Sequence, residues 1–175
     1  MVKAGNKVMR AMVCVACAAA LLQPLHAEPQ PDSPKAIALQ RLHDLTSRAS
    51  DLAVRAMDML GIRYKYGGNG PETGLDCSGL VRYVFKEAWN RDLPRTSREI
   101  SQVGQKVELK DLRPGDLVFY NTLRRSFSHV GIYLGDNKFI HSPSAGGEVR
   151  IESMDVSYWR NRFNGARRID DPAGE

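Results

Sequence analysis

The sequence lacks the features that define several large classes of protein. Its 175 residues contain no run of about 18 or more apolar residues, so a multi-pass membrane protein is excluded. Three cysteines are too few for a disulfide-dense scaffold, and neither internal repeats nor low-complexity tracts occur. Apolar residues still make up 42% of the chain, which can supply the core of one ordinary domain and argues against wholesale disorder.

The first 27 residues have the layout of a secretory signal. Three basic residues precede an apolar run at 11–22, and a polar segment follows Ala27. A run of about 12 apolar residues is too short to span a membrane, so we expect cleavage after Ala27 and an exported protein of the periplasm or cell envelope. The alternative is a lipoprotein anchored through Cys17, although Val15-Ala16 ahead of it departs from the usual Leu-Ala-Gly-like triplet. Membrane contact is expected only in that case.

The net charge of +5 suggests nucleic-acid binding until the charges are located. Removing residues 1–27 takes away three positive charges and two cysteines, which leaves a net charge of +2 and Cys77 as the single thiol. The basic pairs that remain, Arg124-Arg125 and Arg167-Arg168, are too short for a nucleic-acid patch. We therefore expect no nucleic-acid partner.

A helix is predicted directly after a short linker at 28–34. Ser33 suits the N-cap and Pro34 the first helical position. From Ala38 to Met59, apolar residues recur at alternating spacings of four and three, which predicts an amphipathic helix of about seven turns packed on its own domain.

Two features of this helix stay open in the sequence: whether it is continuous and what it packs against. Thr46-Ser47 could divide it in two, and Gly61 is expected to cap its end. A protein partner bound along the helix at 35–60 is the alternative to packing on the domain, with a coiled-coil seam in the first half.

Further along the chain, the sequence predicts two more helices and then four strands. A second amphipathic helix is predicted from Cys77, and Thr96 with Glu99 forms a capping box for a short helix. Strands are then predicted at four places that are bounded by turn residues: 117–120, 130–134, 138–141 and 149–151. Helices followed by an antiparallel meander indicate an α+β domain.

Three residues outside the signal can act as nucleophile or base near neutral pH: Cys77, His129 and His141. Cys77 opens a predicted helix, where the helix dipole and unpaired N–H groups favour the thiolate and lower the pKa from about 8.5. His43, on the first helix, is expected at the surface. His129 begins one predicted strand and His141 ends the next, with the same parity, so both side chains should lie on one face.

The register of this hairpin is open. If the turn centres on Gly135, His129 and His141 lie directly opposite each other, whereas a two-residue loop at Asp136-Asn137 offsets them. The favoured geometry supplies a base with a second histidine to orient it, which together with a thiol is the general form of a cysteine hydrolase triad.

Four blocks in this order resemble the NlpC-type bacterial cell-wall cysteine peptidases of the papain-like clan. They begin at Asp76-Cys77-Ser78-Gly79, Arg113-Pro114-Gly115-Asp116, Ser128-His129-Val130-Gly131 and His141-Ser142. The likeness is closest to small single-domain periplasmic murein endopeptidases. It implies a papain-like α+β fold with N-terminal helices packed on an antiparallel sheet. It also implies a domain at 51–170, preceded by a helical extension at 35–50 and followed by a tail at 171–175.

The resemblance also implies roles for individual residues. Cys77 would be the nucleophile, His129 the base and His141 the orienting third residue, acting on peptidoglycan stem peptides without a cofactor or metal. A tyrosine ahead of the cysteine would help to hold the reacting carbonyl. Tyr64 matches that position, and Tyr66 is the alternative because the following loop is one residue longer than in some members.

Other functions use the same residues. Cys77, His129 and His141 could bind zinc, but no Cys-x-x-Cys or His-x-x-x-His pair supports a zinc site. A catalytically silent module could bind the cell wall or a partner, although no triad residue is missing. A cysteine amidase or an acyltransferase on the same fold also remains open. Serine hydrolysis at Ser78 is not expected, because Gly-x-Ser-x-Gly is absent.

Overall fold

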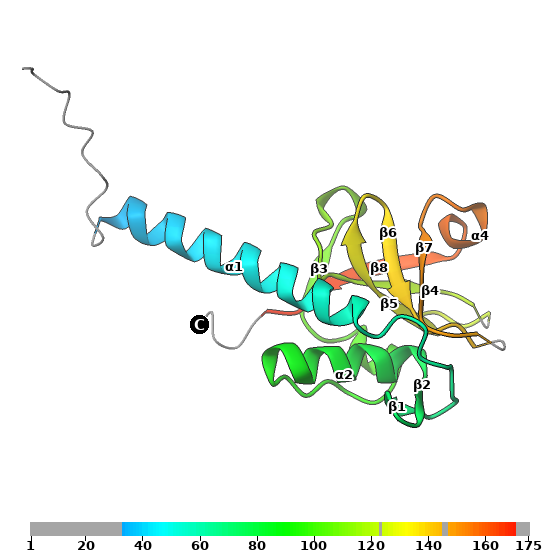
Figure 1. Ribbon diagram of the computed structural model, residues 1–175. Coiled ribbons are helices and arrows are strands. Elements are labelled where there is room, and N and C mark those ends of the chain that lie inside the picture. Colours follow the sequence, from blue (N-terminus) through cyan, green and yellow to red (C-terminus); the bar gives the residue numbers. More distant parts are fainter. Residues whose placement is uncertain (1–32, 123, 145–146, 171–175) are drawn as a thin grey trace, which may run out of the picture.

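The computed structural model describes residues 33–170, apart from 123 and 145–146 (Figure 1). For 41–42 and 44–46 it describes the backbone alone. The predicted export signal, its cleavage site, Cys17 and the tail at 171–175 lie outside the described residues. Within the described part, no helix is long and apolar enough to cross a membrane.

The first element is one continuous helix, α1 (Pro34–Met57). As predicted, Ser33 caps it, because its side chain accepts a hydrogen bond from the Ala36 N–H at 3.1 Å. The helix is not divided at Thr46-Ser47. The predicted cap at Gly61 is wrong: Asp58 is the C-cap, and Gly61 lies in the following turn with φ +78°, where its N–H bonds to the Val149 carbonyl.

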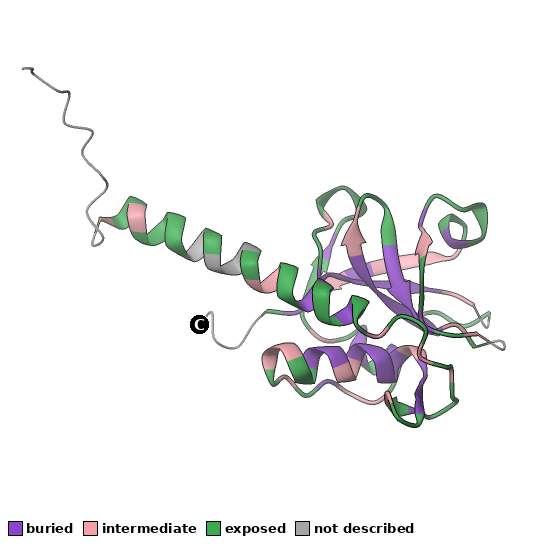
Figure 2. Cartoon of the chain, in the orientation of Figure 1, coloured by how far each residue is buried: buried purple, intermediate pink, exposed green. Residues whose placement is uncertain are grey.

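Only the C-terminal part of α1 packs on the domain. Among its described side chains, the first buried one is Leu52, whereas Ile37, Ala38 and Leu39 are exposed. Figures 1 and 2 show the first half projecting away from the rest of the molecule. The prediction that the whole helix packs on its domain is therefore wrong for the first half, because neither the sheet nor another helix extends that far.

The second layer is a six-stranded antiparallel sheet with the order β3-β8-β4-β5-β6-β7. Its strands are β3 (Gln105–Val107), β4 (Leu117–Tyr120), β5 (His129–Gly135), β6 (Lys138–His141), β7 (Arg150–Ser153) and β8 (Phe163–Arg168). β4 to β7 form the predicted meander. β8 returns to pair with β4, and β3 then pairs with β8. The predicted α+β fold is confirmed.

The other elements are short except for one helix. They are β1 (Asn69–Gly70), β2 (Gly74–Leu75), α2 (Cys77–Trp89), α3 (Ser97–Ile100), a 3₁₀ turn (Leu109–Asp111) and α4 (Ser157–Arg160). α2 begins at the predicted residue, and the predicted capping box at Thr96 and Glu99 is present before α3. β1 and β2 form a small separate hairpin ahead of α2.

The two faces of the large sheet are covered differently. α2 and the end of α1 pack on one face, where the buried side chains are mostly aliphatic: Leu52, Leu80, Val81, Val130, Ile132 and Ile140 among others. α4 covers the opposite face, where the buried cluster is largely aromatic and includes Tyr120, Tyr133, Phe139 and Trp159. Because side chains alternate along a strand, neighbouring residues of β5 and β6 serve opposite faces.

Candidate active site

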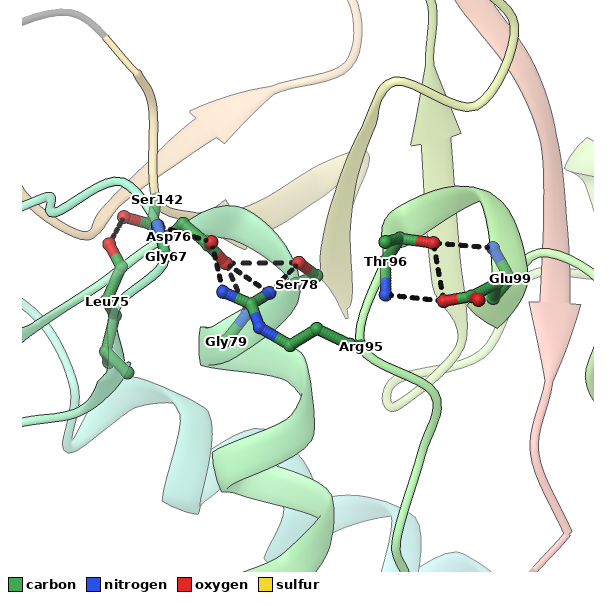
Figure 3. Close-up of polar contacts among 9 residues, drawn as sticks. All are labelled: Gly67, Leu75, Asp76, Ser78, Gly79, Arg95, Thr96, Glu99 and Ser142. Atoms are coloured by element: carbon green, nitrogen blue, oxygen red, sulfur yellow. Dashed lines mark hydrogen bonds and ion pairs between the residues drawn. The ribbon is translucent and has the colours of Figure 1, made fainter.

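The start of α2 is held by a network around its N-cap, Asp76. The carboxylate accepts hydrogen bonds from the Gly79 N–H at 2.7 Å and from Ser78 Oγ at 3.0 Å, and pairs with Arg95 at 2.6 Å (Figure 3). It also accepts from the Gly67 N–H, so it ties the preceding loop to the helix. Burial opposes ionisation of Asp76, but the hydrogen bonds from Arg95 and Gly79 outweigh it and keep the pKa of this carboxyl below its usual range.

Cys77, the free cysteine of this segment, is the first residue of α2 and is half-buried. The backbone N–H groups of Val130, Ser78 and Cys77 itself act on its sulfur and favour the thiolate. Val130 follows His129 in β5, so the sulfur lies near the start of that strand, against which α2 packs.

The predicted low pKa of this thiol is wrong. Burial, and then the charge of neighbouring Asp76, outweigh the backbone donors and raise the pKa of Cys77 to about 11. The prediction weighed only the helix start, whereas the desolvation depends on the elements packed around it.

His129 and His141 meet on the aromatic face of the sheet. Nε2 of His129 lies 2.8 Å from Nδ1 of His141. They are not directly opposite each other. A two-residue loop at Asp136-Asn137, with φ +49° and +54°, pairs Gly135 with Lys138, and a β-bulge between Tyr133 and Gly135 then shifts the register so that Ile132 pairs with Ile140. The offset alternative is therefore the one that the structure adopts, and the two rings contact each other diagonally across the strands.

Gly131 makes room for this contact. A Cβ atom there would lie 2.8 Å from the Ile140 carbonyl oxygen, 2.7 Å from Cδ2 of Phe139 and 3.2 Å from Cβ of His141. Any side chain would push β6 away from β5 at the point where the two imidazoles approach. The glycine is thus required by close packing, not by an unusual backbone angle.

The two imidazoles are neutral at ordinary pH. Burial lowers the pKa of both to about 3, assisted by the proximity of His141 in the case of His129 and by Arg150 in the case of His141. Trp159 of α4 encloses them: its ring stacks on His129 at 5.6 Å between centroids and meets His141 edge-on at 5.0 Å.

A carboxylate that the sequence analysis did not single out stands beyond His141. Oε1 of Glu152 lies 3.6 Å from Nε2 of His141. Glu152 is bound by the Arg150 guanidinium and by the Trp159 indole N–H. One signal was available, since Arg150 and Glu152 are two residues apart in a strand and so share a face, but nothing in the sequence placed that face beside the histidines.

Tyr64 lies near the thiol. Its N–H bonds to the Gly147 carbonyl at 2.8 Å, and its side chain is half-buried. Burial first, and then the charges of Cys77 and Asp76, raise the pKa of the Tyr64 hydroxyl, which places the tyrosine within electrostatic reach of the sulfur. Tyr66, the alternative, is 89% exposed.

Other titratable groups do not join this site. His43 is exposed on α1, as expected. Asp116 pairs with Arg168 at 2.7 Å and accepts from the Arg113 N–H, so it holds the turn before β4. Among residues 33–170 as described, no three His, Cys, Asp or Glu side chains are arranged to hold a metal ion.

Comparison with known proteins identifies the family. The model of the NlpC/P60 family matches residues 61–168. The chain belongs to the NlpC/P60 family. The predicted family resemblance is therefore confirmed, and the matched region contains the Asp76 network, Cys77 and both histidines.

Individual proteins similar to this NlpC/P60 chain carry the names of murein endopeptidases. It is 41% identical over 121 residues to "Murein DD-endopeptidase MepH" of Escherichia coli K12, a match that covers 67% of this chain and 45% of that protein. It is 40% identical over 131 residues to "Murein DD-endopeptidase MepS/Murein LD-carboxypeptidase" of the same strain, covering 75% of this chain and 66% of the relative. The chain thus spans about half to two thirds of the length of these relatives.

A solved structure shares the fold. An NlpC/P60 family protein from Bacillus cereus ATCC 10987 superposes with a TM-score of 0.64 at 34% identity, over 69% of this chain and 39% of the other. The α+β arrangement described above is therefore that of the family.

Proposed function

We propose that this NlpC/P60 protein is a cysteine endopeptidase that hydrolyses peptide bonds in peptidoglycan stem peptides. The observation that carries the proposal is the junction of α2 with β5. There, the thiol of Cys77 lies next to the strand that begins with His129, and His129 is hydrogen-bonded to His141. The names of the murein endopeptidase relatives support the substrate class.

The contact between the ring nitrogens suits general-base catalysis by a neutral pair of histidines. With Nε2 of His129 engaged by His141, Nδ1 is the nitrogen that can receive the proton of Cys77. Because the pKa values of thiol and imidazole keep both neutral at rest, proton transfer accompanies the attack of sulfur on the peptide carbonyl.

The remaining steps conserve that proton. The imidazolium of His129 donates it to the leaving amine as the peptide bond breaks, which leaves a thioester on Cys77. A water molecule, deprotonated by His129, then attacks the thioester. As the carbon–sulfur bond breaks, His129 returns that proton to the sulfur, which restores the thiol and releases the product as a carboxylic acid that ionises in solution. The Cys77 N–H and the Tyr64 hydroxyl are the proposed donors to the oxyanion, supported by the nearness of Tyr64 to the thiol.

The domain division and location belong to the same proposal. Residues 51–170 form the peptidase domain and 35–50 a helical extension, which is supported by Leu52 being the first buried residue among the described side chains of α1. An export signal at 1–27 would place the protein in the periplasm or cell envelope, where its substrate is. The exposed first half of α1 is the part available to a protein partner.

Mass spectrometry of muropeptides tests the function. The purified wild-type protein should release new fragments from peptidoglycan, and Cys77→Ala should release none, because the nucleophile is gone. Circular dichroism spectra that match for the two proteins would serve as the control for folding. Equal products from both proteins would remove Cys77 as nucleophile. Fragment masses would also separate endopeptidase cleavage from amidase cleavage at the sugar–peptide junction.

A further inference from the structure

The histidine pair ends in a buried nitrogen that has no hydrogen bond. Nε2 of His141 is fully buried, and within the described part of the chain no atom hydrogen-bonds to it. A carboxylate faces it, because Oε1 of Glu152 lies 3.6 Å away. This separation is slightly longer than a hydrogen bond, but a charge interaction weakens only gradually with distance, so the carboxylate still acts on the ring.

Glu152 is fixed in that place by two donors. Nε of Arg150 binds Oε1 at 2.5 Å, and the indole N–H of Trp159 binds Oε2. The same indole ring contacts both imidazoles. Glu152 is therefore a partly buried carboxylate locked against the histidine pair rather than a freely rotating surface side chain.

The tautomer of His141 decides which nitrogen of His129 is basic. If Nδ1 of His141 carries the proton, it donates to Nε2 of His129, and His129 must then carry its own proton on Nδ1. Such a ring cannot accept the proton of Cys77. If Nε2 of His141 carries the proton, Nδ1 accepts from Nε2–H of His129, and Nδ1 of His129 is free to act as base.

We propose that Glu152 is a positioning residue that selects this second tautomer. A carboxylate facing Nε2 of His141 attracts an N–H and repels a lone pair, so the proton of His141 is held on Nε2 and the basic nitrogen of His129 on Nδ1. The inference rests on the proposed function, because it assigns a purpose to the orientation of His129. It extends the Cys77, His129 and His141 arrangement by one residue, through contacts on β7 and α4.

The tautomers can be observed without turnover. Long-range ¹H–¹⁵N correlation spectra of the Cys77→Ala protein should show both histidines protonated on Nε2 alone. Glu152→Gln should produce mixed tautomers at both rings, because the amide can offer His141 an N–H instead of an oxygen. Asp155→Asn, which replaces an exposed carboxylate bonded to Asn137, should leave the spectrum unchanged. Protonation of His141 on Nδ1 in the presence of Glu152 would overturn the proposal.

Kinetics supply the second readout. Glu152→Gln should lower kcat about tenfold with KM unchanged, similar to the loss seen when the carboxylate partner of a metal-bound histidine is removed, and Asp155→Asn should leave both unchanged. An equal kcat for Glu152→Gln and wild type would overturn the positioning role while Cys77→Ala stays inactive. Activity that survives Cys77→Ala would instead count against the proposed function. The tautomer spectra would still test the role of Glu152, because they do not depend on turnover.

Discussion

The two faces of the sheet bury different kinds of side chain. The face under α2 buries aliphatic side chains whose contacts are interchangeable in kind, so its stability depends on area and fit. The face under α4 buries His129, His141 and the Tyr120 hydroxyl among aromatic rings. Burying polar groups costs free energy unless partners are supplied, and the structure supplies them to some of these groups and not to others.

This contrast shows how a fold can keep stability and chemistry apart within one strand. Val130 and Ile132 point to the aliphatic face, and His129 and Gly131 belong to the other. A change at one residue of β5 can therefore affect packing, while a change at its neighbour affects proton transfer. Four predictions test how complete this separation is.

The largest effect is expected at His129. Its replacement by alanine should lower the rate of peptide cleavage by a factor on the order of 10² to 10⁴, the range for loss of a general base. Ile132→Ala, a change at a buried residue of the same strand on the aliphatic face, should lower the melting temperature instead and leave the rate of the folded protein close to that of wild type. Steady-state kinetics and thermal unfolding of both variants would measure this. A comparable rate loss in both would show that the two faces do not separate stability from chemistry.

The next largest effect concerns Ile140, which lies between Phe139 and His141 in β6 but faces α2. It is fully buried in the aliphatic cluster, so Ile140→Ala should reduce the free energy of unfolding by about 2–5 kcal/mol through lost transfer energy and a cavity. Urea unfolding followed by circular dichroism measures it. A loss well under 1 kcal/mol would show that this face collapses readily around the cavity.

Acid should destabilise the protein through the aromatic face. In the unfolded chain a histidine takes up a proton below about pH 6.5, whereas in the folded protein the pKa values of His129 and His141 are about 3. Between these limits the unfolded state holds more protons, so the free energy of unfolding falls as the pH is lowered, by up to about 1.4 kcal/mol per pH unit for each histidine. Urea unfolding between pH 7 and pH 4.5 should show a shallower decline for His141→Gln than for wild type, and equal slopes would contradict this.

The smallest effect is expected at Tyr120. Its hydroxyl is buried, and within the described residues it has no hydrogen-bond partner; burial accordingly raises the pKa of Tyr120. Tyr120→Phe should therefore be neutral or stabilise the protein by up to about 1 kcal/mol. Tyr133→Phe is the matched control, because it removes a hydroxyl that accepts from the Asn137 N–H at 3.2 Å, and it should be destabilising. Destabilisation by Tyr120→Phe would mean that this hydroxyl is bound after all.

The sequence predicted best where the signal is local. The start of α2, the capping box at Thr96 and the strands at 117–120 and 138–141 depend on neighbouring residues, and the structure has them. β3 and β8 were not predicted, because they are short or rich in polar and charged residues and exist through pairing with distant strands. The exposure of the first half of α1 also escaped prediction, since periodicity alone does not show where a partner surface ends.

For the candidate site, too, local features were predicted from the sequence and features that depend on the assembled fold were not. Parity placed His129 and His141 on one face, but the register depended on the loop at Asp136-Asn137, which the sequence left open. The pKa of Cys77 was predicted in the wrong direction, because burial is a property of the assembled fold. Glu152 was missed because its importance comes from where β7 and α4 pack, not from a motif.

The projection of α1 has a consequence for reach. Its first 15 or so residues rise by about 1.5 Å each, so they place the start of the helix, Pro34, roughly 22 Å from the domain along the helix axis. A continuous helix resists bending, so it acts as a rigid spacer rather than as a flexible linker. A protein partner bound to the first turns of α1 would therefore lie well away from Cys77. The buried residues Leu52, Ala53 and Ala56 would fix the direction of the helix relative to the domain.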